Sequence, residues 1–248
     1  MKILWSQLVK KTGGKELCRH SDVMITRVGY DSRLISLYEG LLFLAMTGPR
    51  ADGHYFISEL YNRGVRCFVV ERFIDINLYP KANIFLTTSS KACLQDLGRW
   101  AVAHNPIPLI AITGSNAKTL VKEWLAALLS EKFVVAKSPQ SFNSQIGVPL
   151  SVWDLSAHHQ IGVFEAGISQ QGEMECLQKI LQPTIGIFTN IGEAHDRGFK
   201  DLANKIDEKA KLFLGTQQIV CRRDHYEVFD HLKDLYPDRI FDWSTKDP

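Results

Sequence analysis

The stretch Leu109-Ile-Ala-Ile-Thr-Gly-Ser-Asn-Ala-Lys-Thr-Leu-Val-Lys-Glu-Trp124 runs from an apolar segment through a short polar turn into a helical segment. Residues 109–112 form a continuous apolar run, which is typical of a buried strand. Beyond Thr119 the apolar residues recur at helical spacing, at Val121, Leu125, Leu128 and Leu129. The pattern predicts a strand, a tight loop and a helix, with a lysine and a hydroxyl at the mouth of the helix.

This arrangement is suited to binding phosphate, because loop N–H groups and the N-terminus of the helix face the anion. Lys118 could then reach the β- and γ-phosphates of ATP, and Thr119 could hold Mg²⁺. The residues expected to contact the nucleotide are Gly114, Ser115, Asn116, Ala117, Lys118 and Thr119. The standard phosphate-loop pattern has glycine at the positions of Ala117 and Ile112, so an ordinary turn between strand and helix stays open as the alternative.

Length and composition narrow the class of protein. At 248 residues with 45% hydrophobic content, the chain fits two domains better than one. A formal net charge of +2 without a basic block gives no indication of a nucleic-acid partner. The five cysteines contain no C-x-x-C pair, which favours a reducing compartment, and no apolar run approaches the ~20 residues that span a bilayer. We therefore expect a cytoplasmic protein with no membrane insertion.

The segment Asn105-Pro-Ile-Pro108 is the best candidate for a linker, since each proline disfavours helix in the residue before it. Before it we expect helices at 3–11, 55–63 and 90–104 and strand-like segments at 23–28, 41–45, 67–70 and 84–87. After it, helical stretches alternate with strand candidates at 109–112, 133–136, 161–164, 185–189, 217–221 and 239–242. The predicted fold class is α/β, with a first domain at 1–105 and a mostly parallel sheet at 106–248.

In parallel sheets of this kind, ligands bind beyond the carboxyl ends of the strands. That rule draws attention to Glu165, which could hold Mg²⁺ or be a solvated carboxylate, and to His195, which could ligate a metal or be an ordinary loop histidine. Lys209 lies in a helical segment, where a solvated surface lysine is the usual finding.

Several motifs occur in the order seen in one known family. They are Ile112-Thr-Gly-Ser-Asn-Ala-Lys-Thr119, Ser138-Pro-Gln-Ser-Phe-Asn-Ser-Gln-Ile-Gly-Val-Pro149, Phe164-Glu-Ala-Gly167, Thr189-Asn-Ile-Gly-Glu-Ala-His195 and Glu208-Lys-Ala-Lys-Leu-Phe213. Together they resemble the central P-loop ATPase domain of the Mur ligases. Upstream, Asp31-Ser-Arg33 and Asp52-Gly-His54 resemble the N-terminal domain of the uridine-nucleotide-binding members, so the resemblance covers essentially the whole chain.

The resemblance implies an ATP-dependent carbon–nitrogen ligase of peptidoglycan (cell-wall) precursor synthesis. Within the family, the chain is most similar to members that join D-Ala-D-Ala to UDP-N-acetylmuramoyl-tripeptide, especially the form fused to alanine racemase in some bacteria. The resemblance implies that Lys118 contacts phosphate and that Thr119, Glu165 and His195 ligate Mg²⁺. It also implies that Lys209 is carbamylated and that Asn143 lies near the reacting phosphate and carboxylate. Ser32 and Arg33 match the residues that contact the uridine nucleotide.

Two departures from the family qualify these expectations. The family has glycine in place of Ala117, and a methyl group there could obstruct phosphate or strain the backbone if φ is positive. The family also has a C-terminal ligase domain, and we expect this chain to be a fragment that lacks it and has an incomplete central domain. One alternative is another Mur ligase that adds a different residue, or a relative of folylpolyglutamate synthase, although the segment Asp31-Ser-Arg33 argues against the latter. The other alternative is a non-catalytic nucleotide-binding or interaction module.

Overall fold

The computed structural model describes residues 1–49, 51–192 and 198–246. The chain divides into two compact units, Met1–Trp100 and Ala101–Pro248. The division falls inside helix α3 (Ser90–Ala103), a few residues before the proline-rich segment 105–108. No helix in these described ranges is long and apolar enough to cross a membrane.

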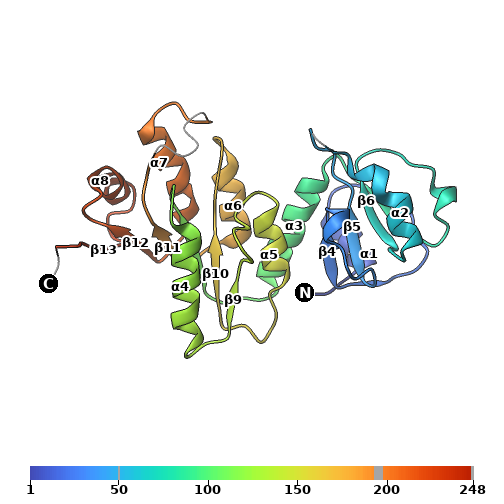
Figure 1. Ribbon diagram of the computed structural model, residues 1–248, viewed down its shortest axis with the longest axis horizontal. Helices are drawn as coiled ribbons and strands as arrows, with labels where there is room; N and C mark the ends of the chain where they lie inside the picture. Colours follow the sequence, from blue (N-terminus) through green and yellow to red (C-terminus); the bar gives the residue numbers. More distant parts are fainter. Residues whose placement is uncertain (50, 193–197, 247–248) are drawn as a thin grey trace. The chain divides into compact units, whose positions relative to one another are not determined.

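The N-terminal unit is built on a five-stranded sheet in the order β2-β7-β6-β5-β4. Figure 1 labels three of its strands, β4, β5 and β6. Its strands are β2 (Lys15–Cys18), β4 (Arg27–Gly29), β5 (Leu41–Leu44), β6 (Cys67–Val70) and β7 (Asn83–Leu86). Strands β4 to β7 run parallel, whereas β2 pairs antiparallel with β7. A short pair, β1 (Ile3–Leu4) and β3 (Met24–Ile25), lies outside this sheet. The helices are α1 (Trp5–Lys11), α2 (Ile57–Asn62) and α3, with 3-10 turns η1 (Ser32–Leu34), η2 (Gly53–Phe56) and η3 (Ile76–Leu78).

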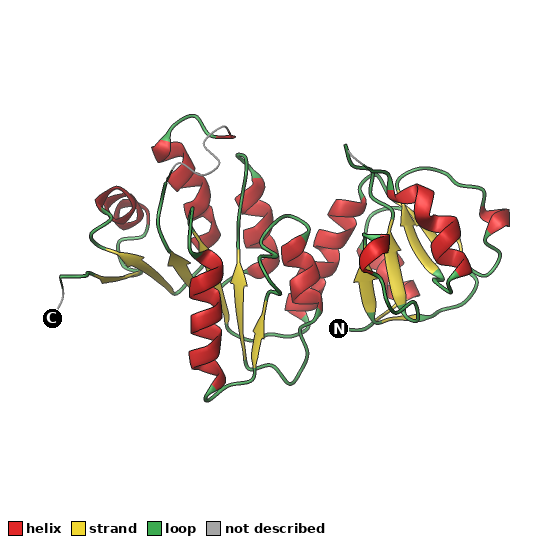
Figure 2. Ribbon diagram, in the orientation of Figure 1, coloured by secondary structure: helices red, strands yellow, loops and turns green. Residues whose placement is uncertain are grey.

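The second unit has a six-stranded, wholly parallel sheet in the order β13-β12-β11-β8-β10-β9. Its strands are β8 (Leu109–Thr113), β9 (Val135–Lys137), β10 (Ile161–Glu165), β11 (Ile185–Phe188), β12 (Gln218–Arg222) and β13 (Ile240–Trp243). The connections carry α4 (Lys118–Ser130), α5 (Gly147–Trp153), α6 (Glu173–Leu181), α7 (Leu202–Ala210), the 3-10 turn η5 (Lys211–Phe213) and α8 (Tyr226–Leu235). Figure 2 shows strands and helices alternating along this unit, as the sequence predicts.

The central strand β8 is apolar from Leu109 to Ile112, and both of its faces are covered by helices. Ile110 and Ile112 belong to the core cluster that includes the buried side of α4. Leu109 and Ala111 belong to the larger cluster on the opposite face, together with residues of α5 to α8. Leu128 of α4 departs from the expected apolar side of the helix, since it is 73% exposed.

The predicted elements are largely present, but several boundaries differ: the strand expected at 133–136, for example, is β9, from Val135 to Lys137. Three further differences follow. Strand β2 has no counterpart among the predictions, because half of its short sequence Lys-Glu-Leu-Cys is charged and it is defined by antiparallel pairing with β7. The helix expected at 3–11 begins only at Trp5, after the two residues of β1. The strand-like segment 23–28 divides into β3 and β4, which pair with different strands.

Helix α7 is anchored to the sheet through the 3-10 turn that follows it. Phe213 packs in the core with its ring centroid 6.3 Å from that of Phe188 in β11. Gly186 makes room for this ring, since a Cβ at that position would lie 2.1 Å from Phe213 Cδ1. This packing fixes the position of α7 and therefore of the Lys209 side chain that it carries.

Candidate active site

The candidate site lies at the carboxyl edge of the parallel sheet in the second unit, where β8, β10 and β11 end side by side. The loop Gly114 to Ala117 follows β8, Glu165 is the last residue of β10, and Thr189 and Asn190 follow β11. Parallel strands that share an edge bring these segments together, as the sequence-based argument expects.

The loop after β8 is braced by the segment after β11. The backbone N–H of Ser115 donates to the Asn190 carbonyl at 2.8 Å, and that of Asn116 donates to Asn190 Oδ1 at 3.0 Å. The Thr189 hydroxyl donates to the Asn116 carbonyl at 2.7 Å. Gly114 has φ +141°, and a Cβ there would lie 2.0 Å from the Thr189 hydroxyl, so the close contact requires glycine.

Ala117 occupies the position that is glycine in the standard phosphate loop, and it adopts the left-handed conformation with φ 63° and ψ 6°. A residue with a Cβ is disfavoured in this region by about 1–2 kcal/mol. Glycine is the residue usually found in this conformation, so the backbone at Ala117 is locally strained.

Lys118 begins α4 and folds back over the loop. Its ammonium donates to the carbonyls of Gly114 at 2.8 Å and Ser115 at 3.1 Å. Burial lowers the pKa of Lys118, and the charge of nearby Glu165 opposes that shift. The cationic end of the side chain is thus held against the loop by which a phosphate group would be recognised.

Glu165 is fully buried and contacts two residues of α4 and one of the segment that carries Asn143. Its Oε2 accepts from the Thr119 hydroxyl at 3.0 Å and from Asn143 Nδ2 at 3.4 Å. Its Oε1 receives no hydrogen bond but lies 3.2 Å from the ammonium of Lys122, whose side chain is also fully buried. The solvated-carboxylate alternative is therefore wrong for this residue.

Lys122 is a contributor that the sequence-based argument did not identify. Besides facing Glu165, its ammonium donates to the carbonyls of Ser138 and Gln140. It thereby connects α4 to the segment that carries Asn143. The signal was available, since Lys122 directly follows Val121 on the part of α4 that packs on the sheet, where a lysine needs a buried partner.

Lys209 is 2% exposed, so it is not a surface lysine. Its ammonium donates to the Gly114 carbonyl at 3.3 Å. Burial, and then the positive charges of Lys118 and Lys205, lower the pKa of Lys209 to about 7. At neutral pH a substantial fraction of this amine is therefore uncharged and can act as a nucleophile.

A hollow of about 160 Å³ brings three of the predicted residues together. Lys118, Asn143 and Lys209 line it, along with residues after β10 such as Gly167. The Asn143 side chain packs closely on Gly167, where a Cβ would lie 2.9 Å from the Asn143 amide. Four segments distant in the sequence thus surround one small space.

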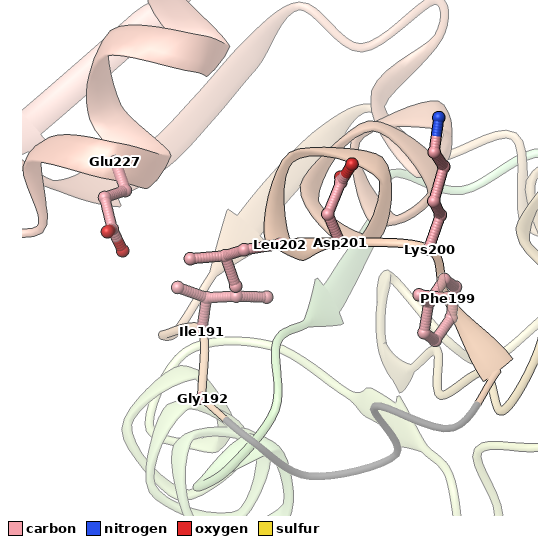
Figure 3. A pocket seen from close by; sticks show the side chains of 7 residues that line it. All are labelled: Ile191, Gly192, Phe199, Lys200, Asp201, Leu202 and Glu227. Carbon is pink, nitrogen blue, oxygen red and sulfur yellow. The ribbon is translucent and has the colours of Figure 1, made fainter.

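A second hollow, of about 460 Å³, opens beside the same edge of the sheet (Figure 3). It is lined by Ile191 and Gly192 after β11, by residues at the start of α7, and by Glu227 of α8. Gly192 links it to the phosphate loop, because its N–H donates to the Ser115 hydroxyl at 3.1 Å. His195 lies outside the described residues, so its expected metal ligation stays a prediction.

The residues present fit a Mg²⁺ ion, which proteins commonly hold with one or two carboxylates plus phosphate oxygens. Glu165 supplies a buried carboxylate oxygen beside the Thr119 hydroxyl at the edge of the phosphate loop. In the described part of the chain no three His, Cys, Asp or Glu side chains gather as a metal cluster. A site completed by phosphate oxygens is consistent with that finding.

In the N-terminal unit, Ser32 and Arg33 follow β4 at the carboxyl edge of its sheet. The Arg33 guanidinium donates to both oxygens of Asp31, at 2.9 and 2.7 Å, and its side chain is 83% exposed. Asp31 also caps η1 by accepting from the Arg33 N–H. The guanidinium is oriented but remains accessible to solvent.

A polar cluster lies at the ends of β5 and β6 in the same unit. Asp52 Oδ1 accepts from the His54 N–H at 2.9 Å and lies 2.6 Å from His54 Nδ1, while Oδ2 pairs with Arg72. His54 Nε2 accepts from the Glu71 N–H at 3.0 Å, so the ring proton is on Nδ1. Burial would raise the pKa of Asp52, but hydrogen bonds from His54 and Arg72 outweigh it and lower that pKa to about 2.

Comparison with known proteins places this arrangement in a family. The description "Mur ligase middle domain" matches residues 112–243, and "Mur ligase family, catalytic domain" matches residues 24–131. The chain belongs to the Mur ligase family.

Its relatives within the family include enzymes named UDP-N-acetylmuramoyl-tripeptide–D-alanyl-D-alanine ligase. The one from Borreliella burgdorferi is 38% identical over 177 residues, covering 69% of this chain and 38% of that protein. The one from Escherichia coli is 30% identical over 198 residues, covering 80% of this chain and 42% of that protein.

Solved structures agree with the sequence relatives. A crystal structure of MurF from Acinetobacter baumannii superposes with a TM-score of 0.83 at 27% identity, covering 98% of this chain and 53% of that one. MurF from Thermotoga maritima in complex with ADP gives a TM-score of 0.77 at 27% identity, covering 89% and 51%. The chain thus spans about half the length of these proteins, or somewhat less.

The Asp52 cluster leads to a prediction about acid stability. A carboxyl with a lowered pKa stabilises the fold above its unfolded pKa of ~3.9, and this contribution is lost as pH falls towards 2. We expect Asp52→Asn to lower the free energy of unfolding by about 1 kcal/mol at pH 7 and to flatten its dependence on pH between 4 and 2. Urea unfolding at several pH values measures both.

The matched control is Asp75→Asn, because Asp75 caps η3 in the same way but its described hydrogen bonds go only to Asn77. We expect that variant to keep the steep acid dependence. An acid dependence of equal slope in Asp52→Asn and the wild type would contradict the role assigned to the cluster.

Proposed function

We propose that the chain forms the nucleotide-binding and substrate-binding part of an ATP-dependent ligase that joins D-Ala-D-Ala to UDP-N-acetylmuramoyl-tripeptide. The observation that carries this proposal is the hollow in which Lys118, Asn143 and Lys209 meet beside the Thr119–Glu165 pair. Support also comes from relatives at 30% identity or more whose names state this reaction.

The reaction would proceed in two chemical steps. First the C-terminal carboxylate of the tripeptide attacks the γ-phosphorus of ATP, giving an acyl phosphate and ADP. Then the amine of D-Ala-D-Ala attacks the acyl carbon, loses a proton and expels inorganic phosphate as the amide forms. Both steps gather several anions in one place, so positioning and charge compensation supply most of the rate.

The phosphate loop would bind the β- and γ-phosphates of ATP. Lys118 already points its ammonium at the loop, and phosphate oxygens would replace the Gly114 and Ser115 carbonyls as its acceptors. Asn143 lies where its amide could orient the γ-phosphate and the attacking carboxylate. Residues Gly114, Ser115, Asn116 and Ala117 would contribute backbone N–H groups and shape.

Thr119 and Glu165 would hold Mg²⁺, with His195 and carbamylated Lys209 serving a second ion. When bound, Mg²⁺ would neutralise charge on the phosphates. Lys122 would hold the Glu165 carboxylate in position, since its ammonium lies 3.2 Å from Oε1.

The N-terminal unit would bind the uridine nucleotide, with Ser32 and Arg33 as contacts at the carboxyl edge of its sheet. We propose that residues 1–105 form this binding domain and that it can move about 105–108, which would allow two substrates to be brought together. A possible alanine racemase partner stays a prediction from the resemblance alone.

Calorimetric titration separates this proposal from a non-catalytic module. We expect ATP with Mg²⁺ to bind, with affinity reduced about tenfold or more in Lys118→Ala because a charged phosphate contact is lost. We expect UDP-N-acetylmuramoyl-tripeptide to bind with affinity reduced in Arg33→Ala. If neither ligand binds, the proposal is contradicted and an interaction module is favoured.

A deletion tests the assignment of the first domain. Uridine-nucleotide binding that survives removal of residues 1–105 would overturn that assignment.

The left-handed Ala117 gives a second prediction. We expect Ala117→Gly to raise the free energy of unfolding by about 1 kcal/mol and to tighten ATP binding, because glycine relieves the strain at φ 63° and removes a methyl group from the loop. Thermal unfolding and calorimetry measure the two effects. Gln182→Gly is the control, since Gln182 also has positive φ but follows α6, away from the loop. Equal ATP affinity in wild type and Ala117→Gly would show that the loop tolerates alanine.

Lys209 gives a third prediction, based on its burial and lowered pKa. Its neutral amine could attack CO₂, forming an N–C bond and losing a proton to give a carbamate anion. With ¹³C-labelled bicarbonate and Mg²⁺, we expect a carbamate resonance in NMR spectra of the wild type and of Lys132→Met, whose lysine is exposed. The resonance should be absent from Lys209→Met.

In an active ligase that contains this chain, Lys209→Ala should lose most turnover, and short carboxylic acids should partly restore it by supplying the missing anion. Unchanged turnover in Lys209→Ala would remove the assigned role.

A further inference from the structure

A hollow of about 690 Å³ lies in the N-terminal unit at the amino ends of its parallel strands. Arg27, Leu41 and Cys67, the first residues of β4, β5 and β6, all line it. Ser32 and Arg33 follow the carboxyl end of β4, so the hollow is at the opposite edge of the sheet from the proposed uridine contacts. It therefore belongs to neither part of the proposed active site.

Three arginines line this hollow: Arg27, Arg63 and Arg66. Arg27 donates to the Glu39 carbonyl at 3.1 Å. Arg66 donates to the carbonyls of Tyr61 at 2.7 Å and Val65 at 2.8 Å. Carbonyl groups orient a guanidinium but do not neutralise it, so these two cations keep their charge.

The acidic groups around the hollow compensate this charge only in part. Glu59 pairs with Arg63 at 2.8 Å, with both side chains about half exposed. Glu39 lines the hollow, but it is an exposed residue that can turn its carboxylate towards water. Three cations face two carboxylates, both of them well solvated, so the hollow retains a positive potential.

The geometry of Arg66 favours recognition of a ligand. Its guanidinium lies 4.6 Å from the centre of the Tyr61 ring, which supports it from one side, and its Nη1 is held by two carbonyls. The side chain therefore loses little freedom when an anion binds. Tyr38 adds a polar group, since its hydroxyl accepts from Arg63 at 3.2 Å and can donate its own proton.

The rest of the lining is apolar and would suit an organic group. Val23, Met24 and Leu41 contribute to the wall, and Met24 is 45% exposed. The volume falls within the range of roughly 300–1,000 Å³ typical of small-molecule sites. A compact ligand group with two negative charges would match the charge of two uncompensated guanidinium groups. A phosphate monoester is such a group, since it carries about −1.5 to −2 charges at pH 7.

We infer that this hollow binds a phosphorylated small molecule whose phosphate pairs with Arg27 and Arg66 and whose organic part packs on Met24 and Leu41. It is a binding site separate from both the phosphate loop and the proposed uridine contacts. Because the ligand would bind only the folded unit, it would also stabilise that unit by mass action.

Phenyl phosphate is a suitable probe, because it combines a phosphate monoester with an apolar body. We expect hydrogen exchange to slow in peptides covering residues 23–41 and 63–67 when it is added to the chain. Calorimetry should show affinity reduced about tenfold or more in Arg66→Gln and, separately, in Arg27→Gln, since each loses a charged hydrogen-bonding partner. Phenyl sulfate, with a single charge, should bind more weakly than phenyl phosphate.

The control is Arg239→Gln, which removes the same charge from a side chain that lies over the Tyr236 ring in the other unit. We expect it to leave the binding of phenyl phosphate unchanged. Thermal unfolding tests whether Arg66→Gln folds, and Arg27→Gln, whose residue is exposed, gives an independent test. Protection confined to residues 109–119, equal affinity in the wild type and both variants, or equal loss in the control would each overturn the inference.

Discussion

The buried ion pair between Lys122 and Glu165 is the interaction on which the geometry of the second unit's site depends. Both side chains are fully buried, and removing one partner of such a pair typically costs about 3–5 kcal/mol because the other charge is left without compensation. The pair joins α4 to β10, and the two carbonyls bound by Lys122 add the segment that leads to Asn143. One buried cation thus fixes the distance between the phosphate loop, a strand end and the loop that faces them.

The same edge of the sheet concentrates positive charge around a small space. Lys118 and Lys209 both donate to the Gly114 carbonyl, and Lys205 donates to that of Gly192. Burial, and then the charges of Lys118 and Lys205, lower the pKa of Lys209 to about 7. An arrangement of this kind is costly without anions, which is why it supports the proposal that phosphate and carboxylate groups are gathered here.

The N-terminal unit uses the two edges of its sheet differently. At the carboxyl edge, Asp52 compensates Arg72 and orients His54, so the charges are largely paired within the protein. At the amino edge, Arg27 and Arg66 are oriented by carbonyl groups and keep their charge. Paired charge serves mainly to hold loops in place, whereas oriented, uncompensated charge can attract a ligand.

Much of this protein was determined by its sequence alone. Apolar runs predicted β6 and the parallel strands of the second unit. The Gly, Pro and polar residues after those runs indicated approximately where the strands end. The strand-end rule brought Thr119 and Glu165 together, because strand ends of a parallel sheet meet at one edge. Asn143 and Lys209 were assigned to the same site only through the resemblance to the Mur ligases.

Only the tertiary structure decided what those residues contact. Strand β2 forms because it pairs with β7, and its short sequence Lys-Glu-Leu-Cys does not by itself indicate a strand. Lys209 has the local sequence pattern of a surface lysine, but tertiary packing buries it, and its ammonium donates to a carbonyl group. The left-handed Ala117 is imposed by the loop geometry against the preference of its own side chain. Local sequence patterns reflect the preferences of neighbouring residues, whereas burial and charge pairing depend on segments far apart in the chain. The sequence therefore located the site but could not give its electrostatics.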